Sequence, residues 1–201
     1  RSPLVVRRYA PRVTAPDEIS AALAEQQAEL SGLLSGLDER DWQRPSPCVG
    51  WSVADVVLHL VQTDALAVAS TRGQLSEVAR DLGDGERRDL TVDGAAAAAV
   101  ARERGASGAV LHARWEAGVE DLRAALDACD PSKRVTWVAG KLSVRTLTTT
   151  RLAETWIHTT DVADAIGVPL QPAPRLKHVA RLAWRTLPYA FARDGRELRG
   201  P

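Results

Sequence analysis

Residues 151–167 read RLAETWIHTTDVADAIG. In a helix, Glu154 and His158 of this stretch lie one turn apart on the same face, because residues four apart are neighbours on a helix surface. The predicted helix ends at Gly167, which suits a left-handed C-terminal cap, and Pro169 cannot continue it. A carboxylate and an imidazole at this spacing can bind one divalent metal ion. The same pair is also common on solvated helix faces, so a metal site requires a third ligand from another part of the fold.

The composition is that of an ordinary globular domain. With 201 residues, of which 45% are hydrophobic, the chain can form one domain with a substantial core. Its 26 basic and 26 acidic residues cancel, so no net positive charge favours binding to nucleic acid. We recognise no signal peptide and no run that approaches the roughly eighteen apolar residues of a membrane span. We therefore expect a cytoplasmic protein that binds neither nucleic acid nor membrane.

Hydrophobic periodicity predicts an all-α fold. Long helices are predicted over residues 17–37, 52–70, 107–128 and 146–166, shorter ones within 71–94 and over 95–101, and a last one after residue 174. Ser52 and Asp55 have the spacing of a capping box, and Pro188 is expected to kink or end the last helix. Residues 41–51 are predicted to form a loop, and residues 134–145 to be extended or irregular. These segments predict an up-and-down four-helix bundle with extra short helices.

His59 is the candidate third ligand. It lies within the second long helix among apolar neighbours, where an imidazole without a partner is costly. In helical bundles, metal sites are formed by inward side chains of facing helices. The alternative for a single histidine of this kind is a core residue hydrogen-bonded to a neighbour. We interpret His112 and His178 as ordinary helix-face histidines, and Cys48 as a structural thiol because no base lies beside it in the sequence.

Two motifs resemble those of a known family. The first is PCVGWSVADVVLHL over residues 47–60, and the second is ETWIHTTDVADA over residues 154–165. In order and spacing they resemble the DinB-like superfamily, and within it the mycothiol-dependent maleylpyruvate isomerase family. The resemblance covers nearly the whole chain from about residue 17.

The resemblance implies a DinB-like four-helix bundle that holds a divalent metal ion through His59, Glu154 and His158. Three protein ligands leave coordination positions open; zinc is our first choice, with nickel, iron or manganese as alternatives. The family's chemistry implies a metal-dependent thiol S-transferase or isomerase, which uses a low-molecular-weight thiol such as mycothiol on a small electrophilic substrate. The alternative is a non-catalytic metal-containing protein that binds a small molecule.

Four further residues are candidates for the pocket or for support of the ligands. Asp161 lies one turn beyond His158 and either orients a ligand, binds substrate or is a solvated carboxylate. Asp55 faces the same choice, with helix capping as a third explanation. Trp137 and Arg151 are candidates for the pocket wall. Their alternatives are core packing for Trp137 and a surface ion pair for Arg151.

We divide the chain into three parts. Residues 1–16 are an irregular lead-in, residues 17–170 are the metal-binding helical bundle, and residues 171–201 are a C-terminal helix and tail. Many members of the family continue into a second domain, and the last part of this chain resembles the connecting segment. We therefore expect either a fragment or a member that lacks the second domain. The sequence leaves a homodimer open, and its abundant arginine, alanine and valine are typical of a GC-rich genome such as an actinobacterial one.

Overall fold

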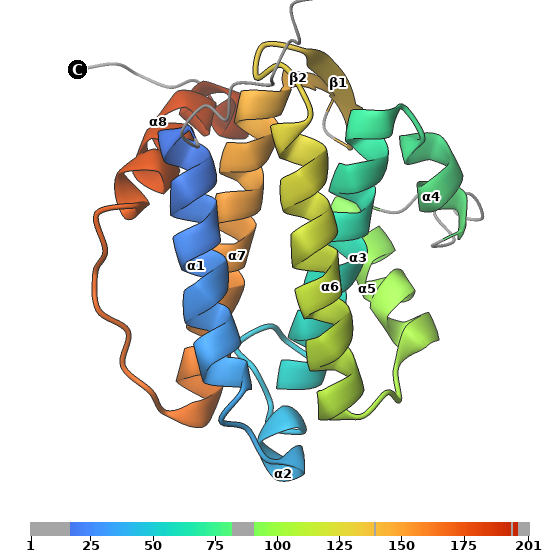
Figure 1. Cartoon of the computed structure of the whole chain (residues 1–201), viewed down its shortest axis with the longest axis vertical. Coiled ribbons are helices and arrows are strands. Elements are labelled where there is room, and N and C mark those ends of the chain that lie inside the picture. The colour runs from blue at the N-terminus through green and yellow to red at the C-terminus, as the bar shows by residue number, and fades with distance from the viewer. Residues whose placement is uncertain (1–16, 82–90, 139, 194, 197–201) are drawn as a thin grey trace, which may run out of the picture.

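Four long helices form the body of the molecule. The computed structural model describes residues 17–81, 91–138, 140–193 and 195–196, so the expected lead-in lies outside the described residues. The long helices run side by side in Figure 1 and are α1 (Glu18–Leu34), α3 (Val53–Arg72), α6 (Gly108–Asp127) and α7 (Val144–Ile166). α3 packs against α6 and α7, and α1 packs against the same two helices. The predicted all-α bundle is confirmed, with each long helix within a few residues of its predicted bounds.

Shorter elements lie at the ends and on one side of this bundle. At one end is α2 (Glu39–Trp42), and at the other is an antiparallel hairpin of β1 (Arg134–Trp137) and β2 (Gly140–Ser143) (Figure 1). The helices α4 (Leu75–Asp81) and α5 (Val92–Glu103) both contact α3. The predicted loop over residues 41–51 therefore begins inside a short helix, and the region predicted to be extended or irregular is a regular hairpin.

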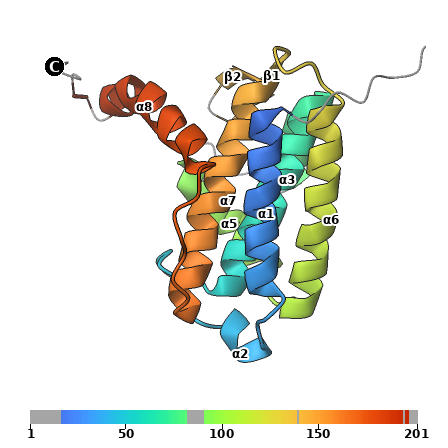
Figure 2. The same ribbon diagram turned by 60° about the vertical axis from the view of Figure 1, so that its left-hand side comes forward.

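The last helix, α8 (Leu176–Arg193), contacts α7 and leans away from the bundle in Figure 2. Pro188 lies inside α8, so the prediction that it could end the helix is wrong. The side chains of Trp184 and Tyr189 are exposed on this helix.

Local signals explain where the two ligand-bearing helices begin and end. At the start of α3, the Ser52 hydroxyl accepts a hydrogen bond from the Asp55 amide while the Asp55 carboxylate accepts one from the Ser52 amide, which is the predicted capping box. α7 begins at Val144, earlier than predicted, because the Ser143 hydroxyl caps it through the Thr146 amide. It ends as predicted at Gly167, whose φ of 75° is the left-handed conformation that glycine adopts without strain.

The interior contains two apolar clusters with buried polar residues between them. On α3, Leu60 belongs to the first cluster and Ala67 to the second, and on α7, Val162 belongs to the first and Leu152 to the second. Between these positions lie the buried polar residues Asp64 on α3 and Thr155, His158 and Thr159 on α7, and the buried Arg151, which precedes Leu152, pairs with Asp64. The polar level of α3 and α7 is where the candidate ligands are found.

α3 is more apolar than we expected of any segment of this sequence. By length and composition it could cross a membrane, although we expected no segment to approach that character. In the structure, 67% of its apolar window is buried inside the protein, as in the core helix of a bundle.

Candidate metal centre

His59, Glu154 and His158 meet between α3 and α7. Nε2 of His59 and Nε2 of His158 each lie 3.6 Å from Oε2 of Glu154. One ligand atom from each of the three residues can be chosen so that all lie within 4.8 Å of one another. The structure thus brings together the pair on α7 and the histidine on α3 that the sequence placed on facing helices.

The geometry of these atoms fits a metal ion better than hydrogen bonding. A separation of 3.6 Å is too long for a good N–H···O hydrogen bond. Tetrahedral ligands about 2.1 Å from a zinc ion are about 3.4 Å from one another, close to the observed spacing. The two imidazole rings are 5.0 Å apart and nearly perpendicular at 80°, so they approach the carboxylate from different directions. Two imidazoles and one carboxylate are also a donor set typical of catalytic zinc sites.

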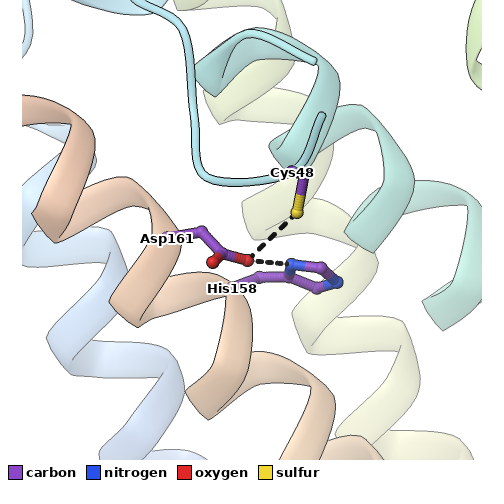
Figure 3. Close-up of side chains that lie close together, drawn as sticks. All are labelled: Cys48, His158 and Asp161. Carbon is purple, nitrogen blue, oxygen red and sulfur yellow. Dashed lines mark hydrogen bonds and ion pairs between the residues drawn. The ribbon is translucent and has the colours of Figure 1, made fainter. Parts of the chain in front are cut away.

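Asp161 fixes the orientation of the His158 ring. Its Oδ2 lies 2.8 Å from Nδ1 of His158. Figure 3 shows the two groups facing each other. In the neutral imidazole that binds a metal through Nε2, Nδ1 carries the proton and donates a hydrogen bond to this carboxylate. The candidate role of Asp161 as a residue that orients a ligand thus agrees with its position.

Cys48 is a neighbour that the sequence did not indicate. Its thiol donates a hydrogen bond of 3.3 Å to Oδ2 of Asp161, the same oxygen that faces His158 (Figure 3). Cys48, His158 and Asp161 also form a second group of potential ligand atoms, which shares His158 with the first. The two residues Cys48 and Asp161 are 113 positions apart, and only the folded loop before α3 brings them together.

His59 is held by an aromatic neighbour. The Trp51 ring lies 5.1 Å from the His59 ring at an angle of 50°. Nδ1 of His59 is buried and has no hydrogen-bond partner among the residues that the structure describes, while Nε2 faces Glu154. The Trp51 ring therefore covers one side of the candidate centre.

The charged groups of the centre shift one another's ionisation. Burial opposes the ionisation of Glu154, but its contacts with His158 and His59 and the charge of Arg151 outweigh this and hold its pKa well below the usual range. Burial likewise opposes the protonation of His158, yet the two carboxylates of Glu154 and Asp161 raise its pKa above the usual value. Burial, together with the hydrogen bond to Asp161, raises the pKa of the Cys48 thiol to about 11. Negative charge at the centre is therefore concentrated on carboxylates, and the thiol stays protonated.

Solvent reaches the centre at the carboxylate. The Glu154 side chain is 39% exposed, whereas the side chains of His59 and His158 are 12% and 11% exposed. A separate groove of about 700 Å³ shares Trp51 with the centre but includes none of the three ligands in its lining. It lies among α2, the loop before α3 and the start of α6.

The other predicted residues are placed differently. Asp55 caps α3 and forms a 2.8 Å ion pair with Arg104, which favours the capping explanation. Arg151 is not at the surface as its alternative supposed: it is 1% exposed and pairs with Asp64, which is equally buried. Trp137, on β1 of the hairpin, packs against the second apolar cluster, which favours the core-packing alternative. The neighbouring Thr136 carbonyl accepts a hydrogen bond from the Ser70 hydroxyl near the end of α3.

His112 and His178 lie outside the groups of potential metal ligands found in the described part of the chain. His112 faces Glu116 at 3.3 Å on α6, and His178 faces Glu18 at 3.9 Å.

A profile of the mycothiol maleylpyruvate isomerase N-terminal domain matches residues 23–163. This span contains all three candidate ligands and most of the four long helices. The chain belongs to this family. An uncharacterized protein of Mycobacterium tuberculosis, found in strains CDC 1551 / Oshkosh and ATCC 25618 / H37Rv, is 31% identical over 176 residues, which cover 88% of this chain and 67% of the relative.

The fold of this family member matches solved structures at the level of architecture. Crystal structures of the mycothiol-dependent maleylpyruvate isomerase and of a mutant of it superpose with a TM-score of 0.66 at 17% and 16% sequence identity. The match covers 89% of this chain and 72% of each of those chains. The DinB-like bundle expected from the two motifs is therefore confirmed.

Proposed function

We propose that this protein is a metal-dependent enzyme that uses a low-molecular-weight thiol, such as mycothiol, to isomerise a small electrophilic substrate or to transfer the thiol to it. The observation that carries the proposal is the convergence of Nε2 of His59, Nε2 of His158 and Oε2 of Glu154, on the side where Glu154 faces solvent. Membership of the mycothiol maleylpyruvate isomerase N-terminal domain family supports the thiol and the isomerase chemistry.

His59, Glu154 and His158 would hold the metal ion, and three protein ligands leave a position for an exogenous group. Zinc suits two imidazoles and a carboxylate, and nickel, iron and manganese accept the same set. Bound there, the ion supplies Lewis acidity, which lowers the pKa of a coordinated thiol so that it ionises near neutral pH.

The residues of the chain position and balance the site. Glu154 contributes a full negative charge, because its lowered pKa keeps it ionised at neutral pH. Asp161 accepts a hydrogen bond from Nδ1–H of His158 and so leaves the Nε2 lone pair free on the side that faces Glu154. Trp51 restricts rotation of the His59 ring. Cys48 donates to Asp161 and, with its raised pKa, does not compete as a nucleophile.

A thiolate explains how one site serves both isomerisation and transfer. When the sulfur adds to a carbon–carbon double bond conjugated to a carbonyl, a C–S bond forms and the π electrons move toward the carbonyl oxygen. The former double bond is then a single bond and can rotate. Elimination of the thiolate restores the alkene in the other geometry, whereas protonation of the adduct completes a transfer.

The proposal is tested by assaying the metal-loaded and metal-stripped protein with maleylpyruvate, with and without mycothiol. Turnover that requires both metal and thiol supports it, and equal rates with and without metal contradict it. His112→Ala is the matched control, because His112 and Glu116 form another histidine–glutamate pair one turn apart, on α6. We expect His158→Ala to abolish turnover and His112→Ala to retain it. Tight binding of maleylpyruvate or mycothiol without turnover would instead support the alternative, a non-catalytic binding protein.

A further inference from the structure

A buried ion pair joins the two helices that carry the candidate ligands. Nε and Nη2 of Arg151 on α7 each lie 2.8 Å from Oδ1 of Asp64 on α3. Both side chains are only 1% exposed. Nη2 of Arg151 also donates to the Thr63 hydroxyl at 3.0 Å. The guanidinium therefore makes three directed contacts with α3 from a single position on α7.

These contacts lie directly beside the candidate metal centre. Arg151 precedes Glu154 by one turn of α7, and Thr63 follows His59 by one turn of α3, with its hydroxyl 2.9 Å from the His59 carbonyl oxygen. A chain of hydrogen bonds thus runs from Arg151 through Thr63 to the backbone of the His59 residue. A shift of α3 along α7 would break the contacts of Arg151 with Asp64 and Thr63, and would also separate His59 from Glu154 and His158.

Stability alone does not explain a buried ion pair at this position. Removing two charges from water costs several kcal/mol per ion, and well-packed apolar residues of similar volume are often as stable or more stable. Burial raises the pKa of Asp64 even though Arg151 opposes this effect. Oδ2 of Asp64 is buried and finds no hydrogen-bond partner in the part of the chain that the structure describes. The pair instead supplies directed contacts: the rigid, planar guanidinium contacts both Oδ1 of Asp64 and the Thr63 hydroxyl, which fixes the relative position of two helices more closely than apolar contacts do.

We propose that Arg151 and Asp64 are positioning residues that set the register of α3 against α7 and thereby the affinity and geometry of the metal site. This inference rests on the proposed function in one respect, namely that His59, Glu154 and His158 bind a metal ion. It assigns to Arg151 a role different from the pocket or surface positions considered from the sequence.

The test separates register from stability by replacing both charges at once. The full chain carrying Arg151→Met and Asp64→Leu is compared with the wild type, and with Arg123→Met plus Gln27→Leu as the matched control. In the control, Nε of Arg123 donates to Oε1 of the buried Gln27 at 2.7 Å, which joins α6 to α1 and not the ligand helices. Two quantities are measured: the melting temperature of the metal-free protein, and the binding of Co²⁺ by titration and by its visible absorption spectrum.

We expect the Arg151→Met, Asp64→Leu protein to melt at or above the wild-type temperature and yet to bind Co²⁺ about 10- to 100-fold more weakly, the range typical of changes to residues that orient metal ligands. Its Co²⁺ spectrum should also change, while the control retains the wild-type affinity and spectrum. Wild-type affinity and spectrum in the doubly substituted protein would overturn the inference. Absence of Co²⁺ binding by the wild type would instead overturn the proposed function.

Thr63→Val provides a second measurement that keeps both charges of the buried ion pair. It removes the hydroxyl that links Arg151 to the His59 carbonyl and leaves a side chain of similar shape. We expect weaker Co²⁺ binding than in the wild type, with the Arg151–Asp64 pair intact. An unchanged affinity and spectrum in Thr63→Val would contradict the inference even if the doubly substituted protein failed to fold.

Discussion

Asp161 receives two hydrogen bonds on one carboxylate oxygen, from Nδ1 of His158 and from the thiol of Cys48. This oxygen links the orientation of the His158 ring, a candidate metal ligand, to the loop that precedes α3. The ionisation of His158 depends on it, because Asp161 and Glu154 together raise the pKa of His158 against the effect of burial. A metal ion binds the neutral imidazole, so metal binding must displace the proton that the protonated His158 ring carries on Nε2.

The first prediction concerns the pH dependence of zinc binding. The raised pKa of His158 means that protons compete with zinc at and above the ordinary histidine value of about 6.5. Zinc affinity should therefore rise with pH across the neutral range. Asp161→Asn removes one of the carboxylates that hold the proton, so the rise should move to lower pH, while the limiting affinity at high pH falls about 10- to 100-fold. Competition titrations between pH 5.5 and 8.5 measure both effects, and identical profiles for the two proteins would contradict this assignment.

The second prediction applies the same pKa to the stability of the metal-free protein. Because the folded-state pKa of His158 is raised, its contacts with Glu154 and Asp161 stabilise the fold fully below the unfolded-state pKa of about 6.5, and this contribution is lost as pH rises through the folded-state value. The wild type should therefore lose more stability between pH 6 and pH 9 than His158→Gln. Thermal unfolding in a chelator tests this, and equal losses in the two proteins would show that His158 carries no such contribution.

The third prediction concerns the reactivity of Cys48. With a pKa of about 11, only about one thiol in ten thousand is ionised at pH 7, so alkylation should be slow there. In a protein carrying Cys129→Ser, iodoacetamide should modify Cys48 at a rate that increases steeply between pH 8 and pH 11. Rapid modification at pH 7 would mean that the thiol is activated and not a hydrogen-bond donor to Asp161.

The same residues show what sequence reasoning can and cannot reach. Glu154 and His158 are separated by one helical turn, so a local pattern and a family motif were enough to pair them. Cys48 is 113 positions from Asp161, and the partner of Arg151 lies 87 positions away on a different helix. Such contacts depend on the register between elements, which hydrophobic periodicity does not fix. Arg151 was accordingly considered for the pocket wall or for a surface ion pair, and the structure shows that its ion pair, with Asp64, is buried.

At the scale of elements, boundaries followed from caps where the sequence carried a clear local signal. The capping box at Ser52 and the left-handed Gly167 were both predicted and observed. The hairpin was not predicted as such, because two strands of four residues each carry too little alternation to be distinguished from irregular structure. Of the two effects expected of Pro188, a kink or an end of α8, the second is wrong, because the helix extends beyond it to Arg193.

The fourth prediction concerns the junction of α2 and α6. A Cβ atom added at Gly108 would lie 2.2 Å from Cδ1 of the buried Trp42 ring, so one of the two must move. Gly108→Ala should lower the free energy of unfolding by about 1–3 kcal/mol, the usual cost of overpacking a core. Gly118→Ala is the control on the same helix, since an added Cβ there meets no atom within 4 Å. Denaturant unfolding of both variants measures the difference, and an undisturbed Gly108→Ala protein would show that Trp42 is not fixed against α6.

At the scale of the whole molecule, the bundle places the candidate centre between two apolar clusters, at a level where α3 and α7 are joined by buried polar contacts. The apolar residues hold the helices together, and the polar level determines how α3 and α7 are aligned. The family could be recognised from two motifs because these motifs contain the three candidate ligands and the start of the helix that carries His59. The substrate could not, because the sides of the site come from segments that are distant in the sequence.

The most direct test of the account is elemental analysis of the full chain purified without added metal, compared with the His59→Ala, His158→Ala double variant. We predict about one divalent ion per wild-type chain and almost none in the variant, with the helical circular dichroism spectrum retained because the apolar clusters are untouched. The same metal content in both proteins would contradict the assignment of His59, Glu154 and His158 as the metal centre.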